Sequence, residues 1–194
     1  MKNYEEGGEI TDTEVLNNIQ RLFNFTNNIR TEYDNHEDYI ILDHWVCWYI
    51  LVNLIGHYDT NGNNMELFTW DGTHWSIIPY DMDLTVGLDA WGGYQIKTTQ
   101  SGFIGGGTFF SSFHTIYSNR ISQIYTKFRN IGIIDVKHIF DIYVAQCSSI
   151  PRDIQQLDKD KWSNIWTNGY PTIEQIYSYI KSRIDYLDTQ WLNN

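Results

Sequence analysis

The sequence predicts an α+β domain that is mainly α-helical and contains one β-hairpin. Several long segments repeat apolar residues at the period of an amphipathic helix. One shorter segment, residues 65–78, instead carries aromatic and β-branched residues on both sides of Asp71-Gly72, which is a hairpin-turn signal. Hydrophobic residues make up 42% and aromatic residues 16% of the 194 positions, so the chain can build one sizeable core. We therefore predict a single domain over residues 1–194.

The chain begins with a polar lead-in and an amphipathic helix. Residues 1–10 are polar and are expected to fray. Thr11 and Glu14 form a capping-box signal, and an apolar repeat follows them, so we predict a helix over residues 12–25. A polar break over residues 27–35 should separate it from the next element.

The next two elements are a buried helix and the hairpin. The helix should run from His36 or Asp38 to Gly56, and apolar residues occupy nearly all of its faces, which is typical of a helix at the centre of a helical lobe. The strands of the hairpin are expected over residues 65–70 and 74–78, with a proline closing the second strand.

The residue pattern in the second half of the chain predicts a loop followed by further helices. Glycine is dense over residues 87–107 without apolar periodicity, so we predict a flexible Gly-rich loop there. The elements expected after it are helices over residues 119–130 and 135–148, a helix or turn after Pro151, and a helix over residues 172–192.

Composition excludes several classes of protein. A net charge of -11 opposes nucleic-acid binding through a broad basic face. The longest apolar stretch, residues 39–55, is too short and too polar for a membrane span, and no apolar leader follows Met1, so no signal peptide is expected. We expect a soluble protein and leave its compartment open. Cys47 and Cys147 are expected to be buried thiols rather than a disulfide.

The first chemical motif reads H-x-D-x-x-x-x-N and starts at His57. This is the spacing at which a protein-kinase catalytic loop presents a base aspartate and a metal-binding asparagine. Asp59 could orient an attacking hydroxyl and accept its proton, so His57 and Asp59 are the candidate catalytic residues. Asn64 could offer an amide oxygen to a metal, and Asn63 and Asn64 are candidates for cofactor binding.

The second motif, Asp81-Met82-Asp83, follows the hairpin. In an extended chain the two carboxylates would face the same side, because side chains alternate with period two. Mg²⁺ favours a few carboxylates together with substrate phosphates. Asp81, Asp83 and Asn64 are therefore the candidate ligands of a magnesium ion that bridges the phosphates of ATP.

Other interpretations of these motifs fit less well. Asp59 could begin a calcium loop, but Asn64 and Trp70 stand where that loop needs glycine and glutamate. A lone D-x-D could hold a manganese nucleotide-sugar in a glycosyltransferase, although no doubly wound α/β pattern precedes it. His57 could bind zinc, but no other histidine or cysteine lies at ligand spacing from it.

The run from Leu51 to Leu88 resembles the CotH kinase family (spore-coat protein H-like). That resemblance implies a divergent protein-kinase fold that phosphorylates secreted or spore-surface proteins with ATP and Mg²⁺, and related sequences occur in phage tail and virion proteins. By the resemblance, Asp59 matches the family's active-site aspartate, and Asp81 or Asp83 its metal-binding aspartate. The residues that carry the resemblance are His57-Tyr-Asp59, Asn63-Asn64, Phe68-Thr-Trp70-Asp-Gly, Trp75, Pro79-Tyr-Asp81-Met-Asp83 and Gly87.

The resemblance also implies that a kinase N-lobe is missing. Such a lobe contributes a sheet over the nucleotide and a lysine for its phosphates, yet Lys2 is the sole lysine before His57. We therefore expect a kinase C-lobe-like helical bundle, with the hairpin between the catalytic-type loop and the D-x-D motif.

Two functions follow from this expectation. The chain could be the C-lobe portion of a Mg-ATP-dependent protein phosphotransferase, completed by an N-lobe in another segment or chain and acting on a protein substrate. Alternatively, it could be a non-catalytic structural component of a phage virion, tail or surface coat that binds protein neighbours.

Overall fold

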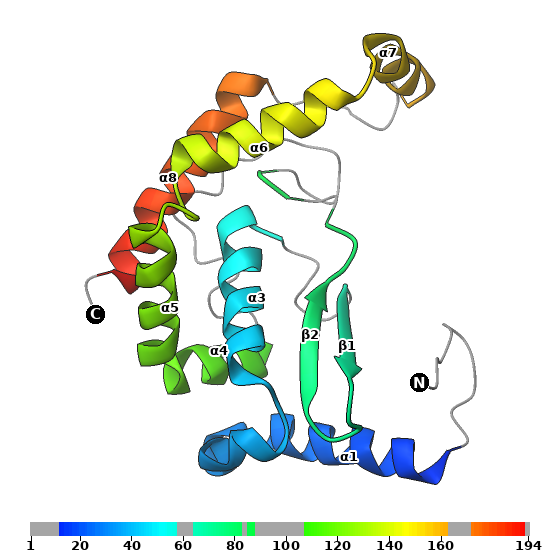
Figure 1. Cartoon of the computed structure of the whole chain (residues 1–194), viewed down its shortest axis with the longest axis vertical. Coiled ribbons are helices and arrows are strands. Elements are labelled where there is room, and N and C mark those ends of the chain that lie inside the picture. Colours follow the sequence, from blue (N-terminus) through cyan, green and yellow to red (C-terminus); the bar gives the residue numbers. More distant parts are fainter. Residues whose placement is uncertain (1–11, 58–63, 83–84, 88–106, 163–171, 193–194) are drawn as a thin grey trace.

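The computed structural model describes residues 12–57, 64–82, 85–87, 107–162 and 172–192. Figure 1 shows an elongated molecule in which helix α3 stands upright between the hairpin and α5, while α6, α7 and the first part of α8 extend away at one end. Within the described residues the chain forms eight α-helices, one 3₁₀ segment and one two-stranded sheet. The predicted α+β class with a dominant helical content is confirmed.

The N-terminal helices form a base beneath the hairpin (Figure 1). Helix α1 (Thr13–Asn27) begins one residue later than predicted, and the Asp12 carboxylate caps it by accepting two backbone N–H groups, whereas Thr11 of the predicted capping box lies outside the described residues. The predicted polar break is wrong, because α2 (Ile29–Glu32) and the 3₁₀ segment η1 (Tyr33–Asp38) follow directly. The buried Ile29 side chain anchors this stretch, and burial of a single apolar residue prevails over a polar composition.

Helix α3 (Leu42–Ile55) is the central helix, as predicted, although it begins later than expected. The residues just before it leave the helical path because Ile40 forms a β-bridge with Trp75 of the hairpin: the Trp75 N–H donates to the Tyr39 carbonyl (2.8 Å), and the Ile41 N–H donates to the Trp75 carbonyl (3.0 Å). The buried members of α3 are Trp45, Val46, Trp48, Tyr49, Ile50, Val52 and Asn53.

The hairpin forms where the sequence predicts it. Strands β1 (Met65–Thr69) and β2 (Trp75–Pro79) pair antiparallel. The Asp71 carboxylate holds the turn by accepting the backbone N–H groups of Thr73 and His74, both at 2.8 Å. Ile77 is buried where β2 packs against α3.

Helix α4 (Gly107–Ile116) is not predicted by the sequence analysis. Most of the expected Gly-rich loop, residues 88–106, lies outside the described residues, but Gly107 already belongs to α4. Phe110 stacks on Trp48, with ring centroids 5.4 Å apart, and Phe113 lies beside Tyr49 at 5.5 Å. These contacts with α3 stabilise a helix whose own sequence, adjoining a glycine run, gives little helical signal.

The C-terminal helices confirm the predicted periodicity. Thr172 and Gln175 form a capping box at the start of the last of these helices. Arg129 of the first helix donates to the Asp188 carboxylate of the last through two of its guanidinium nitrogens, at 2.9 Å each, and so joins the two helices. These helices are α5 (Ser118–Asn130), α6 (Val136–Ser149), α7 (Arg152–Lys161) and α8 (Ile173–Trp191).

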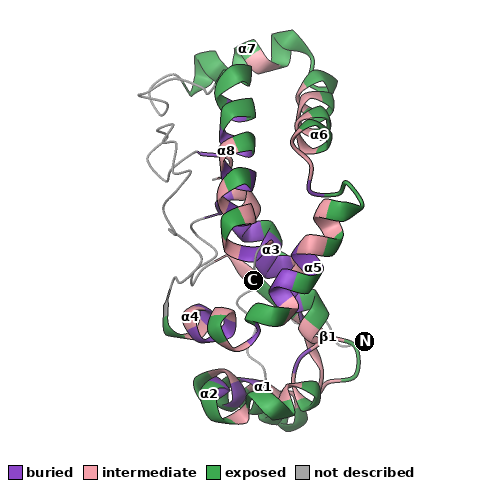
Figure 2. Cartoon of the chain, turned by 90° about the vertical axis from the view of Figure 1, so that its left-hand side faces the viewer, coloured by how far each residue is buried: buried purple, intermediate pink, exposed green. Residues whose placement is uncertain are grey.

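The core lies where α3, α5 and α8 meet (Figure 2). Trp191 packs its ring edge-on against Tyr125 (5.2 Å), and its indole N–H donates to His114. Cys47 and Cys147 are both free and half-buried. No helix in the described part of the chain combines the length and apolarity that crossing a bilayer requires.

A glycine ends α3, and its replacement tests how tightly α8 packs there. Gly56 has a φ of 67°, and an added Cβ would overlap the Tyr179 hydroxyl, whereas Gly132 has a φ of 77° with nothing near its Cβ position. We expect Gly56→Ala to lower the free energy of unfolding by about 2–4 kcal/mol, and Gly132→Ala by only about 1 kcal/mol. Urea denaturation followed by circular dichroism measures both, and equal losses would contradict the packing of α8 on Gly56.

Candidate functional site

The candidate site begins at the C-terminal end of α3. Gly56 adopts the left-handed conformation, and the backbone N–H groups of Gly56 and His57 both donate to the Val52 carbonyl. This ending turns the chain sharply after the last helical residue. The H-x-D-x-x-x-x-N motif therefore starts directly after a buried helix, at a residue whose backbone is hydrogen-bonded to that helix.

His57 connects this point to the D-x-D segment. Its side chain is fully buried, and its Nε2 lies 2.9 Å from the Asp81 main-chain oxygen. A carbonyl oxygen can only accept, so Nε2 carries the proton and donates it. This hydrogen bond joins residues 24 positions apart, on opposite sides of the hairpin.

The D-x-D segment has an unusual backbone. Asp81 has a φ of 50° and Val86 a φ of 55°, and left-handed conformations are costly for residues other than glycine, most of all for a β-branched one. The Val86 N–H donates to the Ile55 carbonyl at 2.7 Å. The end of α3 thus holds this segment at two points, through the His57 ring and through Ile55. Backbone strain that is held in place in this way is concentrated at functional sites in proteins.

The structure describes three of the six predicted site residues. His57 is buried, Asn64 is half-buried just before β1, and Asp81 is exposed at the end of the hairpin. The structure brings His57 and the Asp81 backbone together. The other three, Asp59, Asn63 and Asp83, lie outside the described residues.

The geometry changes one premise of the sequence analysis. Asp81 is not extended, so the period-two alternation that would place Asp81 and Asp83 on one face does not hold at Asp81. Its exposed carboxylate is a hard oxygen ligand of the kind Mg²⁺ prefers. Among the residues that the structure describes, no group of three or more histidine, cysteine, aspartate or glutamate side chains gathers for a metal. A magnesium site here remains a prediction that depends on Asp59 and Asp83.

The sequence analysis missed the arginine that supports this site. Arg183 of α8 is 2% exposed, and its Nε donates to the Asn53 carbonyl at 2.6 Å. A signal for it exists in the sequence, because Arg183 occupies a position on the apolar stripe of α8. The buried apolar members of that stripe are Ile176, Ile180, Ile184 and Leu187.

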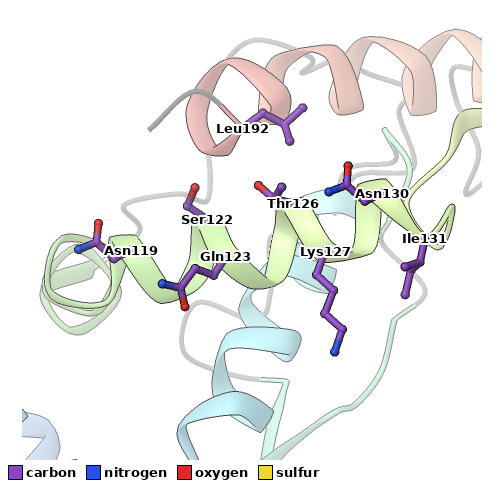
Figure 3. Close-up of a pocket in the computed structure, with 8 residues that line it drawn as sticks. All are labelled: Asn119, Ser122, Gln123, Thr126, Lys127, Asn130, Ile131 and Leu192. Atoms are coloured by element: carbon purple, nitrogen blue, oxygen red, sulfur yellow. The ribbon is translucent and has the colours of Figure 1, made fainter.

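Two hollows of the described surface lie away from these residues. One of about 640 Å³ runs along α5, where Ser122, Thr126 and Asn130 point toward Leu192 at the end of α8 (Figure 3). Another, of about 420 Å³, is apolar and lies between α1, the hairpin and α4. Neither is lined by His57, Asn64 or Asp81.

Replacing His57 tests its hydrogen bond. We expect His57→Ala to lower the free energy of unfolding by about 2–4 kcal/mol, because it removes a buried ring and leaves the Asp81 carbonyl without its donor. His36→Ala is the matched control: the His36 ring also binds a carbonyl at 2.9 Å, but that carbonyl belongs to Tyr33, on the same turn. The control should lose about 1 kcal/mol. Equal losses in urea denaturation would show that the bond to Asp81 contributes little.

Comparison with known proteins agrees with these features. The sequence profile of a family described as CotH kinase protein matches residues 1–187, which include the catalytic-type loop, the hairpin and the D-x-D segment. Neither the curated proteins nor the solved structures include a match to the chain. With nearly its full length matched by the family's profile, this chain belongs to the CotH kinase family.

Proposed function

We propose that this chain forms the C-lobe-like, metal- and hydroxyl-positioning part of a Mg-ATP-dependent protein phosphotransferase. The observation that carries the proposal is the hydrogen bond from the His57 ring to the Asp81 carbonyl. It places the beginning of the catalytic-type loop against the acidic segment, as one cation site shared by both requires. Membership of the CotH kinase family supports the same scaffold.

Each candidate residue has a role in this proposal. Asp59 lies two residues after His57 and would orient the acceptor hydroxyl and take its proton as the acceptor oxygen bonds to the γ-phosphorus. The bond from the γ-phosphorus to the β,γ-bridging oxygen breaks in the same step, and ADP leaves with that oxygen. Asp81, Asp83 and Asn64 would hold Mg²⁺, and Asn63 and Asn64 would contact the nucleotide. The bound Mg²⁺ would supply charge compensation across the phosphates.

The phosphates need a further cation. Lys2 is the sole lysine before His57, whereas a kinase N-lobe supplies a lysine from a strand over the nucleotide. We therefore propose that an N-lobe in another segment or chain completes the site.

A second candidate function is a non-catalytic contact role in a virion, tail or surface coat. The observation that favours it is the number of exposed large apolar side chains on or directly after α6 and α7 and on α8, since exposed apolar surface is common at protein contacts. Helix α7 has no buried residue, and Leu157 on it is 62% exposed. The other exposed apolar side chains here are Ile142, Ile150, Ile154, Trp162, Ile173 and Tyr177.

Transfer of the γ-phosphate distinguishes the two candidates. We expect the chain, together with a complementing N-lobe, to bind Mg-ATP and to transfer labelled phosphate to itself or to a protein acceptor. Asp59→Asn should lower the turnover rate by about 10²–10⁴-fold, because it removes the general base. Asp81→Asn should raise the Mg²⁺ concentration needed for half-maximal rate.

The matched control is Asp141→Asn, which removes a carboxylate that pairs with Lys137 on the exposed face of α6. Asp141→Asn should leave both the turnover rate and the Mg²⁺ concentration for half-maximal rate unchanged. Calorimetry that finds no Mg-ATP binding with any neighbouring segment or gene product, or full activity in Asp59→Asn, would overturn the phosphotransferase and leave the contact role.

A further inference from the structure

We infer that Arg183 of α8 is a positioning residue for the catalytic-type loop, which it controls by binding the last turn of α3. Its effect on catalysis rests on the proposed function, whereas its effect on the loop's starting point does not. Arg183 lies 130 residues from Asn53 in the sequence, so this is a tertiary contact rather than part of the loop itself.

The guanidinium contacts one residue of that turn twice. Nε donates to the Asn53 main-chain oxygen at 2.6 Å, and Nη2 lies 3.4 Å from Asn53 Oδ1. The Asn53 side chain is held in turn, because its Nδ2 donates to the Tyr49 carbonyl at 2.9 Å. All three residues are buried, so the geometry is fixed by packing as well as by hydrogen bonds.

The Arg183 contact explains how α3 can end as it does. In a continuing helix the His57 N–H would donate to the Asn53 carbonyl, four residues back. Here the His57 N–H donates to the Val52 carbonyl instead, at 3.0 Å. Arg183 donates to the Asn53 carbonyl, to which the His57 N–H does not donate here. Without this donor the buried carbonyl would be unpaired, which would destabilise the fold. The direction of the chain at His57, and so the bond from its ring to Asp81, depends on this exchange.

Electrostatics favours an arginine at this place. The C-terminal end of a helix carries a partial negative charge, which stabilises a cation beside its last carbonyls. Helix α8 also contacts the same end one turn away, where Tyr179 lies against Gly56. Arg183 and Tyr179 thus contact two residues, Asn53 and Gly56, at the end of α3 just before the motif.

Apolar packing between α8 and α3 does not by itself require an arginine here. Its neighbours on the stripe, Ile180 and Ile184, are buried and apolar, and α8 packs on α3 through such residues. Methionine would fill the volume of Arg183 but could not donate to the Asn53 carbonyl, and a buried carbonyl that loses its donor is destabilising. Arg183→Met therefore removes this hydrogen bond, at some cost in stability, while it keeps most of the packing.

The test compares Arg183→Met and Arg183→Lys with Arg129→Met. Arg129 also joins α8 to another helix, through Asp188 on α8, but it contacts no part of α3 in the hydrogen bonds of the described residues. The first readout is hydrogen exchange at the Gly56, His57 and Val86 amides, and the second is the turnover rate and KM for ATP in the complemented protein.

We expect Arg183→Met to remain folded and to exchange these three amides at least tenfold faster. The turnover rate should fall at least tenfold with little change in KM. Arg183→Lys, which can still donate to the Asn53 carbonyl, should recover part of both losses and remains informative if the methionine variant does not fold. Arg129→Met should leave the three amides and the turnover rate at wild-type values.

Two results would overturn the inference. One is wild-type exchange at Gly56 and His57 in both Arg183 variants, which would make Arg183 a packing residue only. The other is equal acceleration in Arg129→Met, which would show a general loosening of α8. If the wild-type protein transfers no phosphate, the proposed function fails, but the exchange measurement still decides the positioning role.

Discussion

The hydrogen bond between the His57 ring and the Asp81 carbonyl is the constraint on which the candidate site depends. A hairpin separates these residues in the sequence, and its two strands could end in many relative positions without such a connection. The ring is fully buried, so water does not compete for this hydrogen bond. The bond also holds Asp81 in a left-handed conformation that an aspartate seldom adopts, so the acidic segment is fixed by contacts rather than by its own preference.

The arrangement works only if the end of α3 is itself rigid. Helix α3 is buried on most sides, and its terminal carbonyls are bound by three different parts of the chain. The Val52 carbonyl accepts from the residues that follow the helix, the Asn53 carbonyl from Arg183, and the Ile55 carbonyl from Val86. Pairing of helix-end carbonyls is expected in a protein interior. Here the bond from Arg183 also fixes the end of α3, and with it the start of the motif, relative to α8. This contact links the helical core to the residues of the proposed phosphotransferase site.

The sequence predicts those elements that form through interactions between residues close together in the chain. Asp71-Gly72 predicts the hairpin because the aspartate satisfies the turn's own N–H groups, and the stripe of α8 predicts a long helix because its apolar face must be covered. The hairpin and helix predictions needed no knowledge of distant contacts. The cation site shared by the motif at His57 and the acidic segment remains a prediction, because Asp59 and Asp83 lie outside the described residues.

The remaining features depend on such contacts and could not be predicted. Helix α4 forms against the aromatic face of α3, and α3 begins late because Ile40 forms a β-bridge with Trp75. The left-handed Asp81 is invisible in a D-x-D pattern, which by itself suggests an extended chain. Arg183 looks like an interruption of an apolar stripe until its partner, 130 residues away, is known.

The central claim is that the catalytic-type loop and the acidic segment share one cation. Mn²⁺ in place of Mg²⁺ tests it directly, since this paramagnetic ion broadens the NMR signals of nearby nuclei. Added with ATP to the complemented protein, Mn²⁺ should broaden the His57 ring signals and the Asp81 amide signal at the same low concentration, and leave Gly72 at the far end of the hairpin unaffected. Broadening of only one of the two, or of neither, would contradict the account.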